Sequence, residues 1–149
     1  MAKKNTKYVE EEFKFVYSSE LSIEDYKLLR KHGNFPELSD EQIEFIFNKN
    51  GWRYCCKIDD VPIAMCRFLC DEASFLIITD IVVHTSWRID KAKLPERLIG
   101  GVVDYVKGVL QPDEELQVYL CNMDPCTKSH LEKLGYAPAP NVLYKIVKQ

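Results

Sequence analysis

Apolar residues recur along this chain at two spacings, one typical of strands and the other of helices. Aromatic residues stand at every second position of the segment 13–17, which predicts a half-buried strand. Residues 22–33 place apolar side chains three positions apart, which predicts a helix. Ser22 is a favourable N-cap for that helix, and we expect Gly33 to end it in the left-handed conformation.

A second helix and three strands are predicted next. Ser39 and Gln42 have the spacing of a capping box, and Gly51 follows as a stop. Two runs within 52–70 are separated by an Asp-Asp turn and predict a hairpin. The segment 75–83 consists mostly of β-branched residues, which indicates a central, buried strand.

The second half of the chain continues to alternate helices and strands. Pro95 suits the first position of a helix, and the apolar residues after it keep three- and four-residue steps. These residues are Leu98, Ile99, Val102, Val103, Val106, Val109 and Leu110. Segments 116–120 and 141–147 have the pattern of strands, and 125–135 that of a short helix with a glycine stop. The predicted order is β-α-α-β-β-β-α-β-α-β.

Composition favours a single domain. With 149 residues, of which 46% are hydrophobic, the chain can bury one core, so we expect a charged tail over 1–12 and one domain over 13–149. No run of about 18 apolar residues occurs, and the N-terminus has no apolar core of a signal peptide. We therefore expect a cytoplasmic protein without a membrane partner. The net charge of −3, with dispersed basic residues, argues against nucleic acid.

Six cysteines raise the question of disulfides or metal. They are Cys55, Cys56, Cys66, Cys70, Cys121 and Cys126. No C-x-x-C pair occurs, so reduced and mostly buried thiols are the simplest interpretation, with no metal. A zinc site built from Cys121, Cys126 and His130 is the alternative, although structural zinc usually has paired ligands at closer spacing.

Three stretches carry a resemblance to a known family. They are "ITDIVVH" at 78–84, "LEKLGYAPAP" at 131–140 and the segment 28–75, taken in the predicted order of elements. Together they resemble the GNAT superfamily of acyl-CoA-dependent N-acyltransferases. The resemblance implies one α+β domain whose mixed, mostly antiparallel sheet is flanked by helices. It also implies acetyl-CoA as co-substrate and a primary amine of a small molecule or protein as acceptor.

The phosphate-binding loop of the family is altered in this chain. The family carries R/Q-x-x-G-x-G/A there, since glycines let backbone amides approach a pyrophosphate at a helix N-terminus. The chain keeps Arg88 but places Lys91, Ala92 and Lys93 at the glycine end of the motif. Either the lysines bind CoA phosphates through side-chain charge, or the loop is a solvated connector and the pocket is lost.

The central strand supplies further candidate groups. The resemblance implies that backbone groups of Ile81, Val82 and Val83 hold the acyl thioester, so that catalysis depends largely on positioning. Asp80 matches the acidic residue of the family's I-x-D-x-x-V strand. It is either a general base, with a pKa raised by burial, or a structural aspartate bonded to a neighbouring backbone amide.

The general acid of the family is missing. Aligned on Gly135, Leu131 occupies the position of the tyrosine that protonates the departing CoA thiolate. His130 or Ser129 is a candidate replacement, although one residue along a helix turns a side chain by about 100°. Asn122 matches an asparagine that helps to bind the CoA arm, or is a turn residue bonded to its own backbone.

The acceptor side of the family corresponds to the helix pair and the first hairpin strand. Tyr26, Phe35 and Trp52 lie there, as lining of a substrate pocket or as core residues. Two functions remain open: an acyltransferase, or a non-catalytic module of the same fold that has lost CoA binding. A thiol or metal protein is a third candidate. The terminal strand over 143–147 would give a homodimer if it paired between subunits.

Overall fold

The computed structural model describes residues 15–49, 52–71, 74–84, 93–108, 115–139, 141 and 145. Within these ranges the chain forms strands β1 (Val16–Ser18), β2 (Arg53–Ile58), β3 (Val61–Cys70), β4 (Phe75–Val83) and β5 (Gln117–Leu120). The helices are α1 (Ile23–His32), α2 (Asp40–Lys49), α3 (Leu94–Lys107) and α4 (Pro125–Lys133). The predicted order is confirmed as far as α4. The predicted tail over 1–12 lies outside the described residues, as does the closing strand over 141–147 apart from residues 141 and 145.

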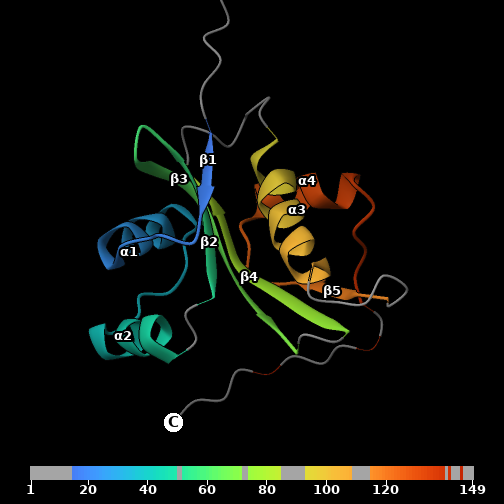
Figure 1. Ribbon diagram of the computed structural model, residues 1–149, viewed down its shortest axis with the longest axis horizontal. Coiled ribbons are helices and arrows are strands. Elements are labelled where there is room, and N and C mark those ends of the chain that lie inside the picture. The colour runs from blue at the N-terminus through green and yellow to red at the C-terminus, as the bar shows by residue number, and fades with distance from the viewer. Residues whose placement is uncertain are drawn as a thin grey trace, which may run out of the picture.

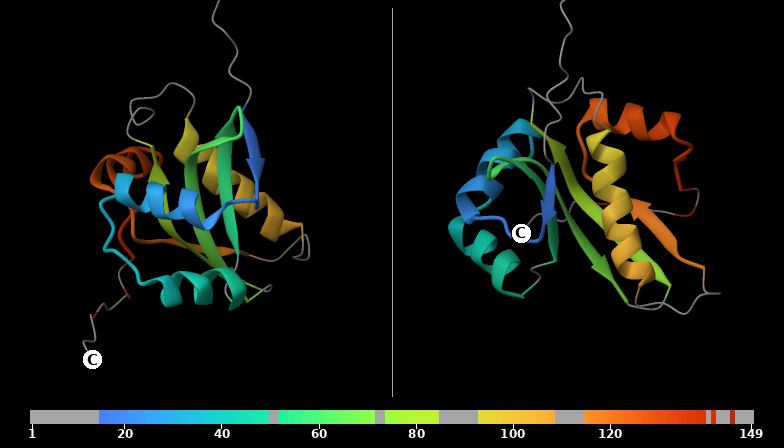
Figure 2. Two further views of the ribbon diagram at one scale, coloured as in Figure 1. Left: turned by 90° about the vertical axis from the view of Figure 1, so that its left-hand side faces the viewer. Right: turned by 45° about the horizontal axis from the view of Figure 1, so that its top comes forward.

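The strands form one mixed sheet between two layers of helices. Its order is β1-β2-β3-β4-β5, with antiparallel pairing up to β4 and parallel pairing between β4 and β5. Figure 1 shows α1 and α2 on one side of the sheet and α3 and α4 on the other, and Figure 2 shows the same layers from two further directions. The expected α+β fold with a mostly antiparallel sheet is confirmed.

Local sequence signals explain where α1 and α2 begin. The Ser22 side chain accepts a hydrogen bond from the Asp25 backbone at 3.1 Å and caps α1. The capping box before α2 forms in both directions: the Gln42 backbone donates to Ser39 Oγ at 3.2 Å, and the Ser39 backbone donates to Gln42 Oε1 at 2.8 Å. These polar contacts satisfy amides that a helix N-terminus leaves without a partner.

Gly33 ends α1 in a way that the sequence did not predict. Its φ is −82°, which is right-handed, and Asn34 takes the positive φ of 54° instead, so the prediction of a left-handed glycine is wrong. The reason for glycine is steric. A Cβ at Gly33 would lie 3.0 Å from Val82 Cγ2 and 3.1 Å from the Phe35 ring. Glycine therefore lets the end of α1 approach β4 closely.

The two faces of the sheet bury separate apolar clusters. The cluster under α3 contains Ile81 and Val83, whereas the cluster under α1 and α2 contains Tyr26, Met65 and Val82. Side chains of β4 alternate between these clusters because successive residues of a strand point to opposite faces. The end of β4 therefore presents one set of side chains to α1 and the other to α3.

The cysteines divide into buried and exposed groups. All six are free; Cys55, Cys56 and Cys66 are buried, whereas Cys121 and Cys126 are exposed. Three of the six thiols are therefore buried, where the sequence predicted burial of most of them. Across the described ranges, no group of three or more His, Cys, Asp or Glu side chains is placed to hold a metal ion. None of the helices in those ranges is long and apolar enough to span a membrane.

Candidate active site at the end of β4

A β-bulge interrupts the central strand at Asp80. Met65 pairs with Val82 and Arg67 pairs with Thr79, so one residue of β3 stands opposite two residues of β4. Asp80 takes a φ of 52°, in the left-handed region that is uncommon for a residue with a side chain. The bulge turns its carboxylate toward α1.

The buried Asp80 carboxylate is the centre of a polar network. Its side chain is 3% exposed, and Oδ2 accepts hydrogen bonds from Arg67 Nε at 2.8 Å, Arg30 Nη1 at 3.0 Å and Tyr26 Oη at 3.0 Å. The Asn122 amide donates to Oδ1 from beyond the end of β5. We call these five residues the Asp80 network. It ties α1, β3, β4 and the end of β5 together.

These contacts bear on the predicted role of Asp80 as a general base. A general base needs an oxygen that the substrate can reach, and each Asp80 oxygen already accepts a hydrogen bond inside the protein. The contacts favour a structural role, but with side chains as partners rather than the expected backbone amide. Burial is the main cause that raises the pKa of Tyr26, followed by the Asp80 charge, so the phenol keeps the proton that it donates.

The parallel pairing of β4 with β5 ends near the bulge. Ile78 and Leu120 form the last regular pair, and one isolated bridge follows between Ile81 and Met123. The Ile81 backbone N–H donates to the Asn122 carbonyl at 3.1 Å. Among the three residues predicted to hold a thioester, Ile81 is therefore already bonded to the chain beyond β5.

The other two residues differ in the direction of their backbone groups. The His84 backbone N–H donates to the Ile63 carbonyl of β3 at 2.7 Å, and Val82 pairs with Met65, which is also in β3. Backbone groups alternate in direction along a strand, so those of Val83 point away from β3. They face the side on which β5 lies, at a level where β5 has ended. Val83 thus has the orientation that the resemblance implies.

The start of α3 is described from residue 93 onward. Arg88, Lys91 and Ala92 lie outside the described residues, so the predicted phosphate contacts can be followed only at Lys93. Lys93 has φ 56° and ψ 45° at the N-cap of α3, and its own side chain makes no capping hydrogen bond. The lysine is exposed and takes a backbone conformation that glycine adopts without strain. Its side chain leaves from the N-terminal end of α3, which carries partial positive charge.

The candidate replacements for the missing acid lie on α4. His130 Nε2 lies 3.1 Å from Glu96 Oε1 in the first turn of α3, and Ser129 is exposed. Leu131, at the position of the family's tyrosine, is 2% exposed and packs in the core under α3. His130 therefore contacts α3, and no hydroxyl stands at the tyrosine position.

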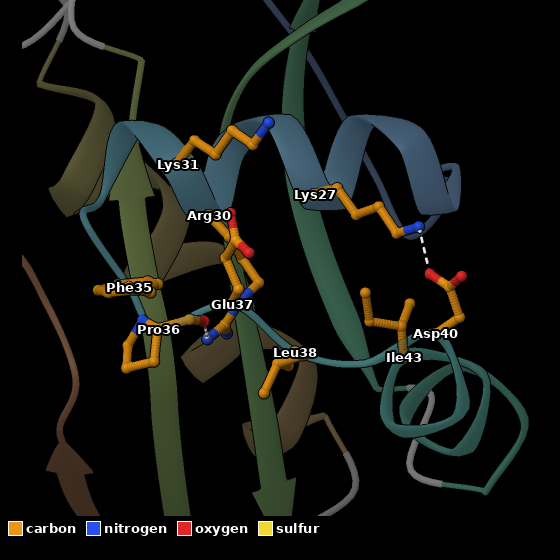
Figure 3. A pocket seen from close by; sticks show the side chains of 9 residues that line it. All are labelled: Lys27, Arg30, Lys31, Phe35, Pro36, Glu37, Leu38, Asp40 and Ile43. Carbon is orange, nitrogen blue, oxygen red and sulfur yellow. Dashed lines mark hydrogen bonds and ion pairs between the residues drawn. The ribbon is translucent and has the colours of Figure 1, made fainter.

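A pocket opens between α1 and α2 next to the Asp80 network. Its volume is about 240 Å³, and Figure 3 shows the side chains around it. The lining residues are Lys27, Arg30, Lys31, Phe35, Pro36, Glu37, Leu38, Asp40 and Ile43. Lys27 Nζ bonds to Asp40 Oδ1 at 2.7 Å across one end, whereas Arg30 bonds to both the Pro36 carbonyl and Asp80. Arg30 thus connects the pocket to the bulge in β4.

The three aromatic residues predicted on the acceptor side lie in different places. Phe35 lines the pocket, and Tyr26 is fully buried and bonded to Asp80. The Arg30 guanidinium lies over both rings, at 5.3 Å from the Phe35 centroid and 5.7 Å from that of Tyr26. Trp52 instead packs against Phe68 and Tyr105, a residue of α3. The structure brings Tyr26 and Phe35 together but not Trp52.

Two residues of the network were missed in the sequence. Arg30 follows Tyr26 by four positions, a spacing that places both side chains on one face of a helix. Arg67 is a lone charge in an otherwise apolar strand, which is a signal for a buried partner. Neither signal identifies Asp80 as that partner, because the three residues are far apart in the sequence.

Comparisons with known proteins agree with this geometry. No family model and no curated protein sequence matches the chain. A Staphylococcus aureus protein of unknown function, SA2161, described as a probable acetyltransferase, superposes with a TM-score of 0.71 at 23% identity, over 91% of this chain and 98% of that one. The GNAT-family protein SP0256 of Streptococcus pneumoniae gives 0.66 at 15% identity, over 92% and 98%.

A third similar structure is that of an acetyltransferase whose acceptor class is given in its name. It is the aminoglycoside acetyltransferase meta-AAC0020 from an uncultured soil sample, solved with trehalose, which gives a TM-score of 0.61 at 15% identity. The alignment covers 91% of this chain and 97% of that protein. Because these proteins share one fold over nearly their full lengths, the likeness shows that the chain has the GNAT fold.

Proposed function

We propose that this chain, which has the GNAT fold, is an acyltransferase that moves an acetyl or related acyl group from a CoA thioester to a primary amine. The observation that carries this proposal is the bulge at Asp80, where β4 continues past the end of β5. There the backbone of Val83 faces the side that β5 has left. A thioester carbonyl bound at this point would lie beside the pocket between α1 and α2, from which an amine would approach.

Binding of the donor would rest on a few groups. Backbone groups at the end of β4 would hold the acyl arm, which is the kind of positioning that supplies much of the rate in such reactions. Lys93 at the start of α3 is the described residue best placed for a CoA phosphate, since a lysine acts as a point charge on phosphate. The Asp80 network would keep β4 and the end of β5 in a fixed arrangement around the thioester.

A non-catalytic binding module is the second candidate. Three observations favour it. Ile81 N–H is already bonded to the Asn122 carbonyl, and Leu131 leaves no hydroxyl for the departing thiolate. Glu96 also brings a negative charge to the first turn of α3, although His130 contacts it. In this alternative the fold is kept and the CoA site is closed.

Thermal melting with and without acetyl-CoA separates the two candidates, followed by calorimetric titration. A ligand present at about 100 times its dissociation constant stabilises the folded state by about 2.7 kcal/mol, which raises the midpoint by several degrees. Acetyl-pantetheine, which lacks the nucleotide phosphates, is the matched ligand. The proposal expects a shift with acetyl-CoA that Lys93→Ala reduces, and a smaller shift with acetyl-pantetheine in both proteins. No shift at millimolar acetyl-CoA would favour the binding module.

A further inference from the structure

Two histidines meet at the end of β4. His84 is the first residue after the strand, and His32 is the last residue of α1. Their ring centroids lie 3.8 Å apart with 44° between the ring planes, and both residues are partly exposed. We call them the histidine pair. The chain has only one other histidine, so two of its three imidazoles stand in contact at this point.

The fold brings the pair to the face of β4 that Asp80 occupies. Asp80 and Val82 face α1, and the alternation of a strand puts His84 on the same face. Gly33 allows the end of α1 to approach Val82 closely, and His32, the residue before it, contacts His84 there. The pair therefore lies one residue beyond Val83, beside the place proposed for the thioester and on the face of the sheet that α1 covers.

The chemistry of this position differs from that of Asp80. Asp80 is buried with its oxygens bonded inside the protein, whereas the histidine rings are partly exposed to solvent. Imidazole changes its charge near neutral pH, so it can take up and release a proton under physiological conditions. A residue at this position can exchange that proton with water after each reaction cycle. The Asp80 carboxylate could take up a proton only by giving up a hydrogen bond that a neighbouring side chain donates to it.

The two rings lie in different surroundings. His32 lies in the last turn of α1 beside the basic residues Arg30 and Lys31, and His84 follows the end of β4. The charged groups on the elements packed around the pair are Arg67 of β3, Asp80 of β4 and, in α1, Glu24, Asp25, Lys27, Arg30 and Lys31, of which only the last two share its final turn with His32. Arg30 and Arg67 are both bonded to Asp80.

We propose that His84 is the general base of this site and that His32 is its positioning residue. The proposal rests on the proposed acyltransferase function. In the step, an imidazole nitrogen of His84 takes one proton from the ammonium of the acceptor. The freed nitrogen lone pair forms a C–N bond to the thioester carbonyl carbon, and the C–S bond breaks. The CoA thiolate leaves with the electron pair of that bond, takes up the second proton that the amine nitrogen loses, and becomes the thiol. His84 then returns its proton to solvent.

The test is the pH dependence of acetyl transfer from acetyl-CoA to four amines: lysine, spermidine, kanamycin and tyramine. The rate of transfer is measured as the release of CoA thiol. Wild type is compared with His84→Gln and His32→Gln, because glutamine keeps hydrogen-bonding atoms but does not titrate. His84→Asn is a second substitution in case the first fails to fold. Melting midpoints and acetyl-CoA binding are measured for each variant, so that loss of structure is seen separately.

The variants at His84 and His32 are expected to differ in their kinetics. His84→Gln lowers kcat by about 10²- to 10⁴-fold, the usual contribution of a general base, with KM for acetyl-CoA nearly unchanged. Its remaining rate rises with pH as the free amine becomes abundant in solution. His32→Gln lowers kcat less than His84→Gln does, because His84 keeps its ring nitrogens and loses only the ring that packs against it.

Two other outcomes have different meanings. A folded His84→Gln that keeps the wild-type kcat and the same fall at low pH would overturn the role of His84 and leave the acyltransferase intact. A wild-type protein that releases no thiol with any of the four amines would overturn the proposed function and this inference together.

Discussion

Replacing Asp80 with asparagine is expected to destabilise the protein strongly. Arg30 and Arg67 share this carboxylate, and the three side chains are 9%, 24% and 3% exposed, respectively. Asparagine keeps the size of the side chain but removes the negative charge. Two guanidinium groups would then lie close together inside the protein without a counter-charge, and the new amide group would face donors that need an acceptor.

The size of the effect follows from this burial. Removing one partner of a buried ion pair costs about 3–5 kcal/mol, because the other charge stays buried without compensation. For a domain of this length each kcal/mol lowers the melting midpoint by about 2–4 °C. The Asp80→Asn protein is therefore expected to melt about 6–20 °C below the wild type.

The assay is thermal and denaturant unfolding of four proteins: wild type, Asp80→Asn, Arg30→Met, and the double variant. The double variant should recover part of the loss, since it removes one of the two uncompensated charges. The matched control is Asp40→Asn, which breaks the pair between Lys27 and Asp40. Their side chains are 43% and 83% exposed, so its midpoint should stay near that of wild type.

Two results would show that the Asp80 network contributes little to stability. One is an Asp80→Asn protein that melts within about 2 °C of wild type, which would mean less than about 1 kcal/mol from the whole network. The other is strict additivity of Asp80→Asn and Arg30→Met, because residues in direct contact within one network should couple.

Three further predictions concern the core and its close contacts. A thiol reagent should modify the exposed Cys121 and Cys126 rapidly and the three buried cysteines only on unfolding, so fast reaction of more than three thiols would contradict the packing of β2 and β3. Burial raises the pKa of Tyr26 above its usual 10.0, so its contribution to stability is full below pH 10 and is lost as pH rises through the folded value. Unfolding midpoints on both sides of pH 10 should fall less steeply in Tyr26→Phe, and equal slopes would contradict this. Gly33→Ala should lower the melting midpoint, because its Cβ would lie 3.0 Å from Val82; an unchanged midpoint would mean that α1 can move away from β4 without cost.

The helices and strands were predictable because their signals are local. The capping box of Ser39 and Gln42 depends on residues three positions apart, and both of its hydrogen bonds form. The Asp59-Asp60 turn of the hairpin has φ values of 49° and 62°, a conformation that aspartate tolerates better than most residues. Such signals do not require knowledge of the rest of the chain.

The site was predictable only in part because its contacts are long-range. A buried aspartate in the central strand could be identified from the apolar residues around it. Its partners Arg30 and Arg67 come from two other elements, and no spacing along the sequence relates them to β4. The same reason explains Trp52, whose aromatic neighbours Phe68 and Tyr105 come from other strands and helices.

Gly33 illustrates the same limit for the backbone. A glycine after a basic helical turn is typical of a left-handed helix end, so the sequence predicted that conformation for Gly33, and the prediction is wrong. The residue is needed instead because Val82, far along the sequence, lies against it. The contact exists only once α1 has packed on β4, and it also sets the place where His32 meets His84.

The most direct test of the acyltransferase proposal is whether the purified protein transfers an acetyl group. It is incubated with isotopically labelled acetyl-CoA and the same four amines at neutral pH, and the products are separated and identified by mass spectrometry. An acyltransferase should give a labelled acetamide of at least one amine, formed in equal amount to free CoA and absent with heat-denatured protein. Intact acetyl-CoA and unmodified amines after prolonged incubation would contradict the proposal.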